Sequence, residues 1–241
     1  MKRRITTPTL LMFIAAIAMM LVSAVGITRA ALTETETYDS QIDMKNIGVI
    51  LQENGLEVEG DNLLFEFARG DYGKFKIGVT YPELITVQNS GDIDEYVRVI
   101  VRKYWCDNTD GGSKNNELDP KYIELVFNEE DWIKDENAST DEREVFYYKK
   151  ILKPGTDTAS AEISAPLITD LRISTEVKQI VDIQMVDGKP YGTYAYDGKW
   201  FGLDVEVDAV QTHHAQDAIK SAWGVDATVD EAAGTLTEVK S

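Results

Sequence analysis

Residues 200–210 read Trp-Phe-Gly-Leu-Asp-Val-Glu-Val-Asp-Ala-Val, and apolar and acidic residues alternate through most of this stretch. Successive side chains of a β-strand point to opposite faces of the sheet, so one side is expected to face a core and the other to face water. The apolar side consists of Leu203, Val205, Val207 and Ala209, and the acidic side of Asp204, Glu206 and Asp208. The stretch therefore predicts a half-buried strand.

The same two-residue period recurs along the chain, in segments rich in β-branched and aromatic residues that end at Gly, Pro, Asn or Asp. These segments are residues 74–79, 84–87, 96–105, 122–127, 145–148, 162–173, 181–186 and 191–196. Two boundaries are Asp-Gly pairs, at 187–188 and 197–198, which favour type I′ turns and predict two tight hairpins. We expect residues 84–105 and 180–210 to supply much of the sheet core.

One short helix is expected, over residues 215–223, because Gly224 fits its C-terminal stop and four apolar residues share a face. That face carries Ala218, Ile219, Ala222 and Trp223. Many strands, one helix and no repeating βα pattern predict an all-β fold, an antiparallel two-sheet jelly-roll sandwich. Two polar segments, 106–116 and 128–144, are expected to be surface loops, the second an acidic insertion with eight carboxylates.

The first thirty residues have the order of a secretory signal peptide, which is basic, then apolar, then small. The basic start is Lys2, Arg3 and Arg4, the uncharged run is Leu10 to Ile27, and the expected cleavage region is Ala24, Ala30 and Ala31. We therefore expect residues 1–30 to form a signal helix that a signal peptidase removes, and residues 31–241 to form a single domain. A retained membrane anchor is the alternative, because about 18 apolar residues approach the length that spans a bilayer.

The 241-residue chain is strongly acidic, with 24 Lys and Arg against 42 Asp and Glu and a formal net charge of −18. We do not expect the chain to bind nucleic acid, because contacts to phosphates need stripes of Lys and Arg and the sequence has none. Cys106 is the only cysteine, so no disulfide forms within the chain. We expect it to pack as a small apolar residue at the end of its strand.

The sequence contains no motif for catalysis or for phosphate binding. It lacks G-x-S-x-G, G-x-x-x-x-G-K-[ST], G-x-G-x-x-G and H-E-x-x-H. His213 and His214 are adjacent and are expected to be solvated at a strand-to-helix junction rather than to bind zinc. Asp107–Gly112 departs from the calcium-loop spacing. No catalytic, cofactor-binding or metal-ligating residue is predicted, and the chain is not expected to be an enzyme.

The segment Thr33-Glu34-Thr35-Glu36-Thr37-Tyr38 alternates β-branched and acidic residues just after the expected cleavage region. A free alternating segment can add a strand to a neighbour's open sheet edge. A contact of this kind that does not close produces a filament. A frayed N-terminus without such a role is the alternative.

Four segments, taken in order, give the chain a resemblance to the TasA/camelysin family of exported Gram-positive proteins. They are Ala24–Ala30, Gln88–Val99, Leu152–Gly155, and Val207–Gln211 followed by Ala215–Trp223. The resemblance implies a jelly roll, export through a dedicated signal peptidase, and fibres of a biofilm matrix in which an N-terminal strand completes the next subunit. In this sequence the corresponding residues are Ala31, Leu32, Thr33, Glu34, Thr35, Glu36, Thr37, Tyr38, Asp39 and Ser40.

The expected function is that of a secreted structural protein, a subunit of an extracellular matrix or cell-surface fibre of a Gram-positive bacterium. Its expected partners are other copies of itself or other matrix proteins, with membrane contact only through an uncleaved signal. Two alternatives remain open. One is a surface-exposed binding module whose loops 106–116 and 128–144 hold a ligand or calcium. The other is a camelysin-like peptidase.

Overall fold

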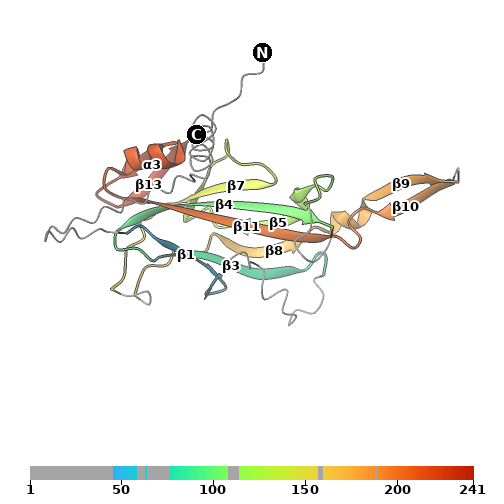
Figure 1. The fold of residues 1–241 in the computed structure, drawn as a ribbon, viewed down its shortest axis with the longest axis horizontal. Coiled ribbons are helices and arrows are strands. Elements are labelled where there is room, and N and C mark those ends of the chain that lie inside the picture. Colours follow the sequence, from blue (N-terminus) through green and yellow to red (C-terminus); the bar gives the residue numbers. More distant parts are fainter. Residues whose placement is uncertain (1–45, 59–62, 64–75, 108–113, 157–159, 188) are drawn as a thin grey trace, which may run out of the picture. The chain divides into compact units, whose positions relative to one another are not determined.

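The computed structural model describes residues 46–58, 63, 76–107, 114–156, 160–187 and 189–241 (Figure 1). All of them belong to the unit Met44–Ser241. The expected signal helix and the cleavage region at Ala24, Ala30 and Ala31 lie outside the described residues. Among the residues that are described, no helix has both the length and the apolar character needed to cross a bilayer.

Two antiparallel sheets form most of this unit, as the alternating sequence predicts. The first has the order β2-β1-β3-β8-β5, with β1 (Val49–Glu53), β2 (Leu56–Glu57), β3 (Thr80–Asn89), β5 (Ile123–Phe127) and β8 (Ile168–Ile173). The second has the order β11-β4-β7-β6, with β4 (Glu95–Cys106), β6 (Trp132–Lys134), β7 (Arg143–Tyr148) and β11 (Trp200–Gln211). The all-β prediction is therefore confirmed.

Three smaller pieces complete the described structure. They are the hairpin β9 (Val181–Val186) and β10 (Lys189–Tyr194), the helix α3 (Ala215–Trp223) with the hairpin β12 (Asp226–Asp230) and β13 (Thr235–Lys240), and the short 3-10 helices η1 (Pro120–Tyr122) and η2 (Thr175–Gln179). Strand β3 begins at Thr80, so the strand expected at residues 74–79 is wrong over its described part, residues 76–79, which contains a turn. Strand β3 continues through Pro82, and its register with β8 shifts between Pro82 and Ile85.

The main core lies between the two sheets and draws side chains from both. Ile85 and Val87 of β3 and Ile168 of β8 come from the first sheet. From the second sheet, β4 and β7 contribute Val97, Val99, Val101, Phe146 and Tyr148. Because the inner faces of both sheets are apolar, their packing excludes water along the length of β4 and creates a β-sandwich.

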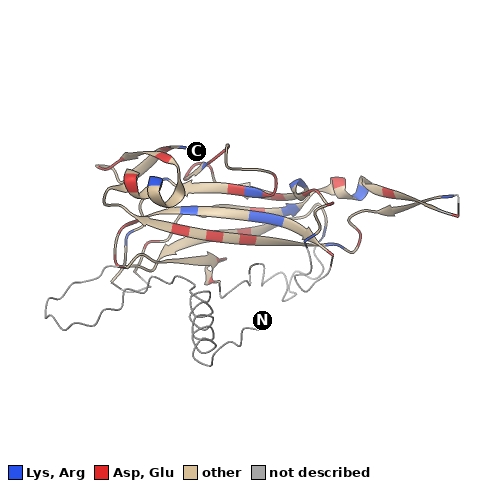
Figure 2. Cartoon of the chain, turned by 45° about the horizontal axis from the view of Figure 1, so that its top comes forward, with Lys and Arg blue, Asp and Glu red and all other residues tan. Residues whose placement is uncertain are grey.

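Strand β11 confirms the expectation from residues 200–210. Val205, Val207 and Ala209 pack against the main core, and Leu203 is buried. In Figure 2 the acidic residues of β11, in red, run beside the basic residues of β4, in blue. Asp208 accepts a hydrogen bond from Nε of Arg98 at 3.0 Å, and Glu206 lies 2.8 Å from Arg102. The outward face is therefore a cross-strand charge ladder.

Helix α3 and the β12–β13 hairpin cover one end of the outer face of the second sheet. Ile219 and Trp223 of the helix pack with Tyr96, Tyr147 and other buried side chains in a second core. Gly224 ends the helix with a φ of 75°, as expected. Of the four residues predicted to share the apolar face, Ala222 is exposed, because the buried stripe runs through Ala215, Ile219 and Trp223 instead.

One of the two predicted hairpins forms and the other does not. Strands β9 and β10 pair across Asp187, whose φ of 51° suits the first position of a type I′ turn. At Asp197-Gly198 the chain also turns, but β10 and β11 do not pair. All of β11 from Trp200 to Gln211 pairs with β4, and this buries its apolar side, which a hairpin with β10 would not do.

Residues 128–144 are more than the surface insertion that their acidity predicts. They contain β6, which pairs with β7 in the second sheet. The side chain of Trp132 is buried in the main core, and its indole N–H donates to the carbonyl of Ala165 at 3.0 Å. Seven of the eight carboxylates lie in the segments that flank β6 and the eighth, Glu144, lies in β7, while Trp132 secures the segment to the sandwich.

Candidate functional site

The predicted assembly segment, Ala31–Ser40, lies outside the described residues, as does most of the loop 106–116. The structure does describe the place where the chain that follows this segment joins the sandwich. Residues 46–48 lead into β1, and they lie against the bend formed by residues 90–92 between β3 and β4. We call residues 46–48 and 89–95 the N-terminal junction.

Backbone hydrogen bonds hold the two sides of the N-terminal junction together. The carbonyl of Gly48 accepts from the N–H groups of Ser90 at 2.8 Å and Gly91 at 3.1 Å, and the carbonyl of Asn46 accepts from Asp92 at 2.8 Å. A β-carbon at Gly91 would lie 2.4 Å from the carbonyl oxygen of Asn46. Only glycine permits this close approach of the two backbone segments, so the junction requires glycine at position 91.

Glu95 is the buried carboxylate of the junction. Its side chain is fully buried, and one oxygen, Oε1, accepts the N–H of Gly48 at 2.7 Å. The other oxygen, Oε2, is buried without a hydrogen-bond partner. Burial raises the pKa of Glu95 to about 7, and the hydrogen bond from Gly48 offsets part of this effect. The group is therefore poised to titrate near neutral pH.

Asn89 joins the junction to the rest of the sandwich. Its side-chain amide donates to the carbonyls of Ile93 at 2.7 Å and Leu152 at 2.8 Å, and its oxygen accepts the N–H of Gly91 at 2.7 Å. Leu152 also exchanges two backbone hydrogen bonds with Glu95. Because each of these polar groups has a hydrogen-bond partner within the protein, the bend is held in one conformation.

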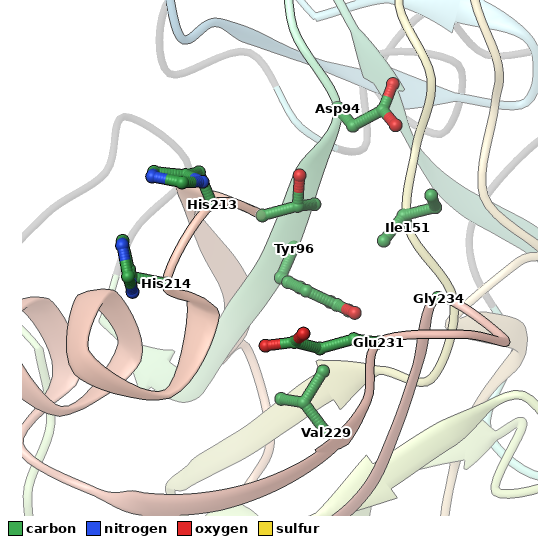
Figure 3. A pocket seen from close by; sticks show the side chains of 9 residues that line it. Asp94, Tyr96, Ile151, His213, His214, Val229, Glu231 and Gly234 are labelled. Carbon is green, nitrogen blue, oxygen red and sulfur yellow. The ribbon is translucent and has the colours of Figure 1, made fainter.

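Two adjoining surface pockets flank the junction. One, of about 590 Å³, includes Ile47, Asp92 and Pro154 in its lining, and the other, of about 410 Å³, is lined in part by Tyr96, His214 and Glu231. Both include Asp94 and His213. Figure 3 shows the smaller pocket, with Tyr96 beside Glu231 and the two histidines near the start of the helix. Burial and the negative charges of Glu231 and Asp230 raise the pKa of Tyr96.

The two histidines lie where the sequence places them. His213 and His214 are exposed between β11 and α3, and their ring centroids lie 4.2 Å apart. Cys106 is buried at the other end of the β4–β11 pair, where it is opposite Trp200. The two ends of the β4–β11 pair are separated by eleven strand residues, a distance of roughly 37 Å. The thiol of Cys106 therefore has no histidine beside it to act as a base.

Four of the eight carboxylates of residues 128–144 contact other groups of the protein, those of Asp131, Asp135, Glu142 and Glu144. Asp131 lies 2.9 Å from Nζ of Lys150, and Glu144 contacts both Lys103 and Lys134. Asp135 is buried and accepts the N–H groups of Asn137 and Ala138. Within the described part of the chain, no three His, Cys, Asp or Glu side chains are arranged to hold a metal ion.

The second sheet ends at β11, a strand of 12 residues. Among the described strands β4 alone pairs with it, so its other margin, from Trp200 to Gln211, has no ladder partner there. Long exposed edge strands are templates for pairing with another chain. This margin is the longest strand edge that the structure offers for such pairing.

Comparisons of the chain with protein-family models, with curated proteins and with solved structures found no match. The functional argument therefore rests on the residues and on the geometry described above.

Proposed function

We propose that this chain is a secreted structural protein that assembles, through backbone pairing of strands, into a fibre of an extracellular matrix or bacterial surface. The N-terminal segment Ala31–Ser40 of one copy adds a strand to the open margin of β11 in the next copy. This contact joins two different surfaces and so repeats without closing, which produces a filament.

The observation that carries the proposal is the length of β11 at the edge of the second sheet. It has 12 residues and one described partner, β4. Native proteins shorten, cover or charge such edges because unpaired N–H and C=O groups recruit other strands. A donated strand would satisfy these groups and extend the sheet by one position.

The charges along β11 are compatible with a Thr-Glu donor strand. If Thr33, Thr35 and Thr37 lie on the core side of the sheet, then Glu34 and Glu36 lie on its outer side. On that side two of the three carboxylates of β11 already have cationic partners, since Arg98 contacts Asp208 and Arg102 contacts Glu206. The repulsion that remains is weakened by dissolved cations.

A jelly roll remains our proposed topology for the sandwich. The two sheets and their antiparallel pairing support it, as does the chain's repeated passage between sheets, for example from β3 to β4 to β5. Among the described strands β1 pairs with β2 and β3, and β11 lies at the edge of the second sheet, which is the feature on which the assembly proposal depends.

Substitution of one donor residue tests the pairing directly. Thr35→Pro removes a backbone N–H from the donor strand and should prevent fibre formation, because proline cannot donate to a ladder. Thr35→Val keeps the N–H and the β-branched shape and should form fibres like the unmodified protein. Electron microscopy of both exported variants provides the measurement. Equal fibres from the two variants would contradict the proposal.

A further inference from the structure

The β9–β10 hairpin extends away from the two sheets and packs on neither (Figure 1). Every side chain that the structure describes in its two strands is exposed. Ile183 and Met185 expose 70% and 68% of their surface, far more than apolar residues of a folded strand normally do. A two-stranded hairpin is marginally stable in water, so an unpacked one with exposed apolar residues indicates a contact that the isolated chain lacks.

The strand register gives the hairpin one uncharged face and one more polar face. On one face Val181 lies opposite Tyr194, Ile183 opposite Gly192, and Met185 opposite Pro190. None of these six side chains carries a charge, and their only polar group is the hydroxyl of Tyr194. On the other face Asp182 lies opposite Thr193 and Gln184 opposite Tyr191. We call the uncharged side, made of those first six residues, the apolar face of the hairpin.

The position of the apolar residues disfavours insertion into a lipid membrane. A hairpin that inserts needs an apolar tip, whereas this tip carries the charged residues Asp187 and Lys189. The apolar residues instead line one side of the ribbon along its length. An apolar side of this kind fits another protein surface of complementary shape.

We propose that the apolar face of the hairpin is an interface between two copies of this chain, packed face to face with the two hairpins antiparallel. Charge favours a second copy. The protein carries a net charge of −18, but residues 176–199 contain four acidic and three basic residues. Two acidic molecules can therefore approach through this nearly neutral arm without bringing their charged surfaces together.

When a two-fold axis in the plane of the contact relates the two copies, the apolar residues of one hairpin lie against those of the other. It places Ile183 against Ile183 and Gly192 against Gly192 of the second copy at the centre. Val181 then meets the second copy's Met185, and Tyr194 meets its Pro190. The acidic tip residue Asp187 comes near the base of the other hairpin, where Lys178 is exposed. The apolar residues of the two copies therefore pack against one another across the axis.

The size of the face predicts a weak contact. Two strands of six residues cover an area roughly 20 Å long and about 10 Å wide. Together the two copies bury less than the roughly 1,200 Å² typical of a stable complex. The interface should therefore be short-lived between isolated molecules and strengthen where many copies are held in one assembly. It is independent of the N-terminal segment and would join subunits laterally.

Site-directed cross-linking tests this contact in the exported protein. Ile183→Cys places a thiol on the two-fold axis, and Gln184→Cys places one on the opposite face of the same strand. Both sites are exposed, and the native Cys106 is buried. Under mild oxidation we expect the I183C protein to form disulfide-linked dimers on a non-reducing gel and the Q184C protein to stay monomeric. Equal cross-linking of both variants, or of neither, would overturn the proposal.

A second variant pair tests the same contact without cysteine. Ile183→Asp puts a charge at the centre of the apolar face and should abolish any concentration-dependent dimer seen by sedimentation, whereas Gln184→Asp should preserve it. Cosedimentation of the unmodified protein with phosphatidylcholine vesicles, lost in I183D, would assign the face to a membrane and contradict the proposal. Because these readouts do not require fibres, they remain informative if the proposed strand donation fails.

Discussion

Glu95 accepts a hydrogen bond from the backbone N–H of Gly48 at 2.7 Å, and this bond joins the start of the second sheet to the residues that lead into the first. Its other carboxylate oxygen is buried without a partner. The protonated form of Glu95 is therefore better tolerated than the charged form. Both the strength of the N-terminal junction and its dependence on pH follow from this one side chain.

We predict that the free energy of unfolding falls as the pH rises from about 4.5 to about 7. Burial raises the pKa of Glu95 from its ordinary value of 4.5 to about 7, so in this range the folded state binds a proton that the unfolded state has lost. The loss for this group is about 3 kcal/mol. Urea unfolding of the unmodified protein and of Glu95→Gln at pH 5 and pH 8 measures it. The glutamine variant should lack this part of the pH dependence, and identical pH profiles would refute the assignment.

The buried ion group Lys103–Glu144–Lys134 should be needed for stability. Oε1 of Glu144 lies 3.2 Å from Lys103 and Oε2 lies 3.0 Å from Lys134. Glu144→Ala leaves two ammonium groups without their carboxylate and should lower the free energy of unfolding by about 3–5 kcal/mol. The exposed Glu136→Ala is the matched control and should change it by less than about 0.5 kcal/mol. Denaturant titration compares them, and a small loss for Glu144→Ala would show that the group is dispensable.

The acidic segment 128–144 should prove to be part of the core. Trp132→Ala removes a buried indole that packs 4.8 Å, centroid to centroid, from Tyr148, and it should cost about 3–5 kcal/mol. Trp200→Ala changes an exposed tryptophan on β11 and serves as the control. Thermal unfolding followed by circular dichroism gives the comparison. If both variants unfold at the same temperature, the segment is a dispensable loop after all.

Assembly should depend strongly on salt. At low ionic strength the charges of neighbouring acidic subunits repel over about 30 Å, and at 1 M over about 3 Å. Light scattering of the exported protein should therefore show faster fibre growth as sodium chloride is added. Fibres that grow fastest in the absence of salt would mean that attraction between charges drives assembly.

Local pattern was enough to predict the helix and many of the strands, although it missed β1, β2, β6, β12 and β13. The alternation at residues 200–210 places Val205 and Val207 on the core side, and the structure confirms it. The apolar stripe and Gly224 likewise predict α3 and its end. Period and turn chemistry are local properties, so a single sequence reveals them.

The pairing of strands that are distant in the chain could not be predicted from the sequence. Residues 180–199 have the alternation of core strands, yet β9 and β10 form an exposed arm, because β11 pairs with β4 rather than with β10. The acidity of residues 128–144 likewise draws attention away from Trp132, whose buried side chain belongs to the edge strand β6. The choice of partner strand depends on the whole chain and leaves no local signal.

The N-terminal junction was missed for a related reason. Asn89, Gly91 and Glu95 resemble an ordinary polar turn in sequence, and only the approach of residues 46–48 makes Glu95 a buried acid. A glutamate directly before an apolar strand was the one available signal. The donor segment Ala31–Ser40 lies outside the described residues, so its role remains a prediction.

Deletion of Ala31–Ser40 from the exported protein tests the central claim most directly. Sedimentation and electron microscopy should then show a folded monomer that forms no fibres under conditions in which the undeleted protein polymerises. Unchanged fibres after the deletion would contradict strand donation from the N-terminus.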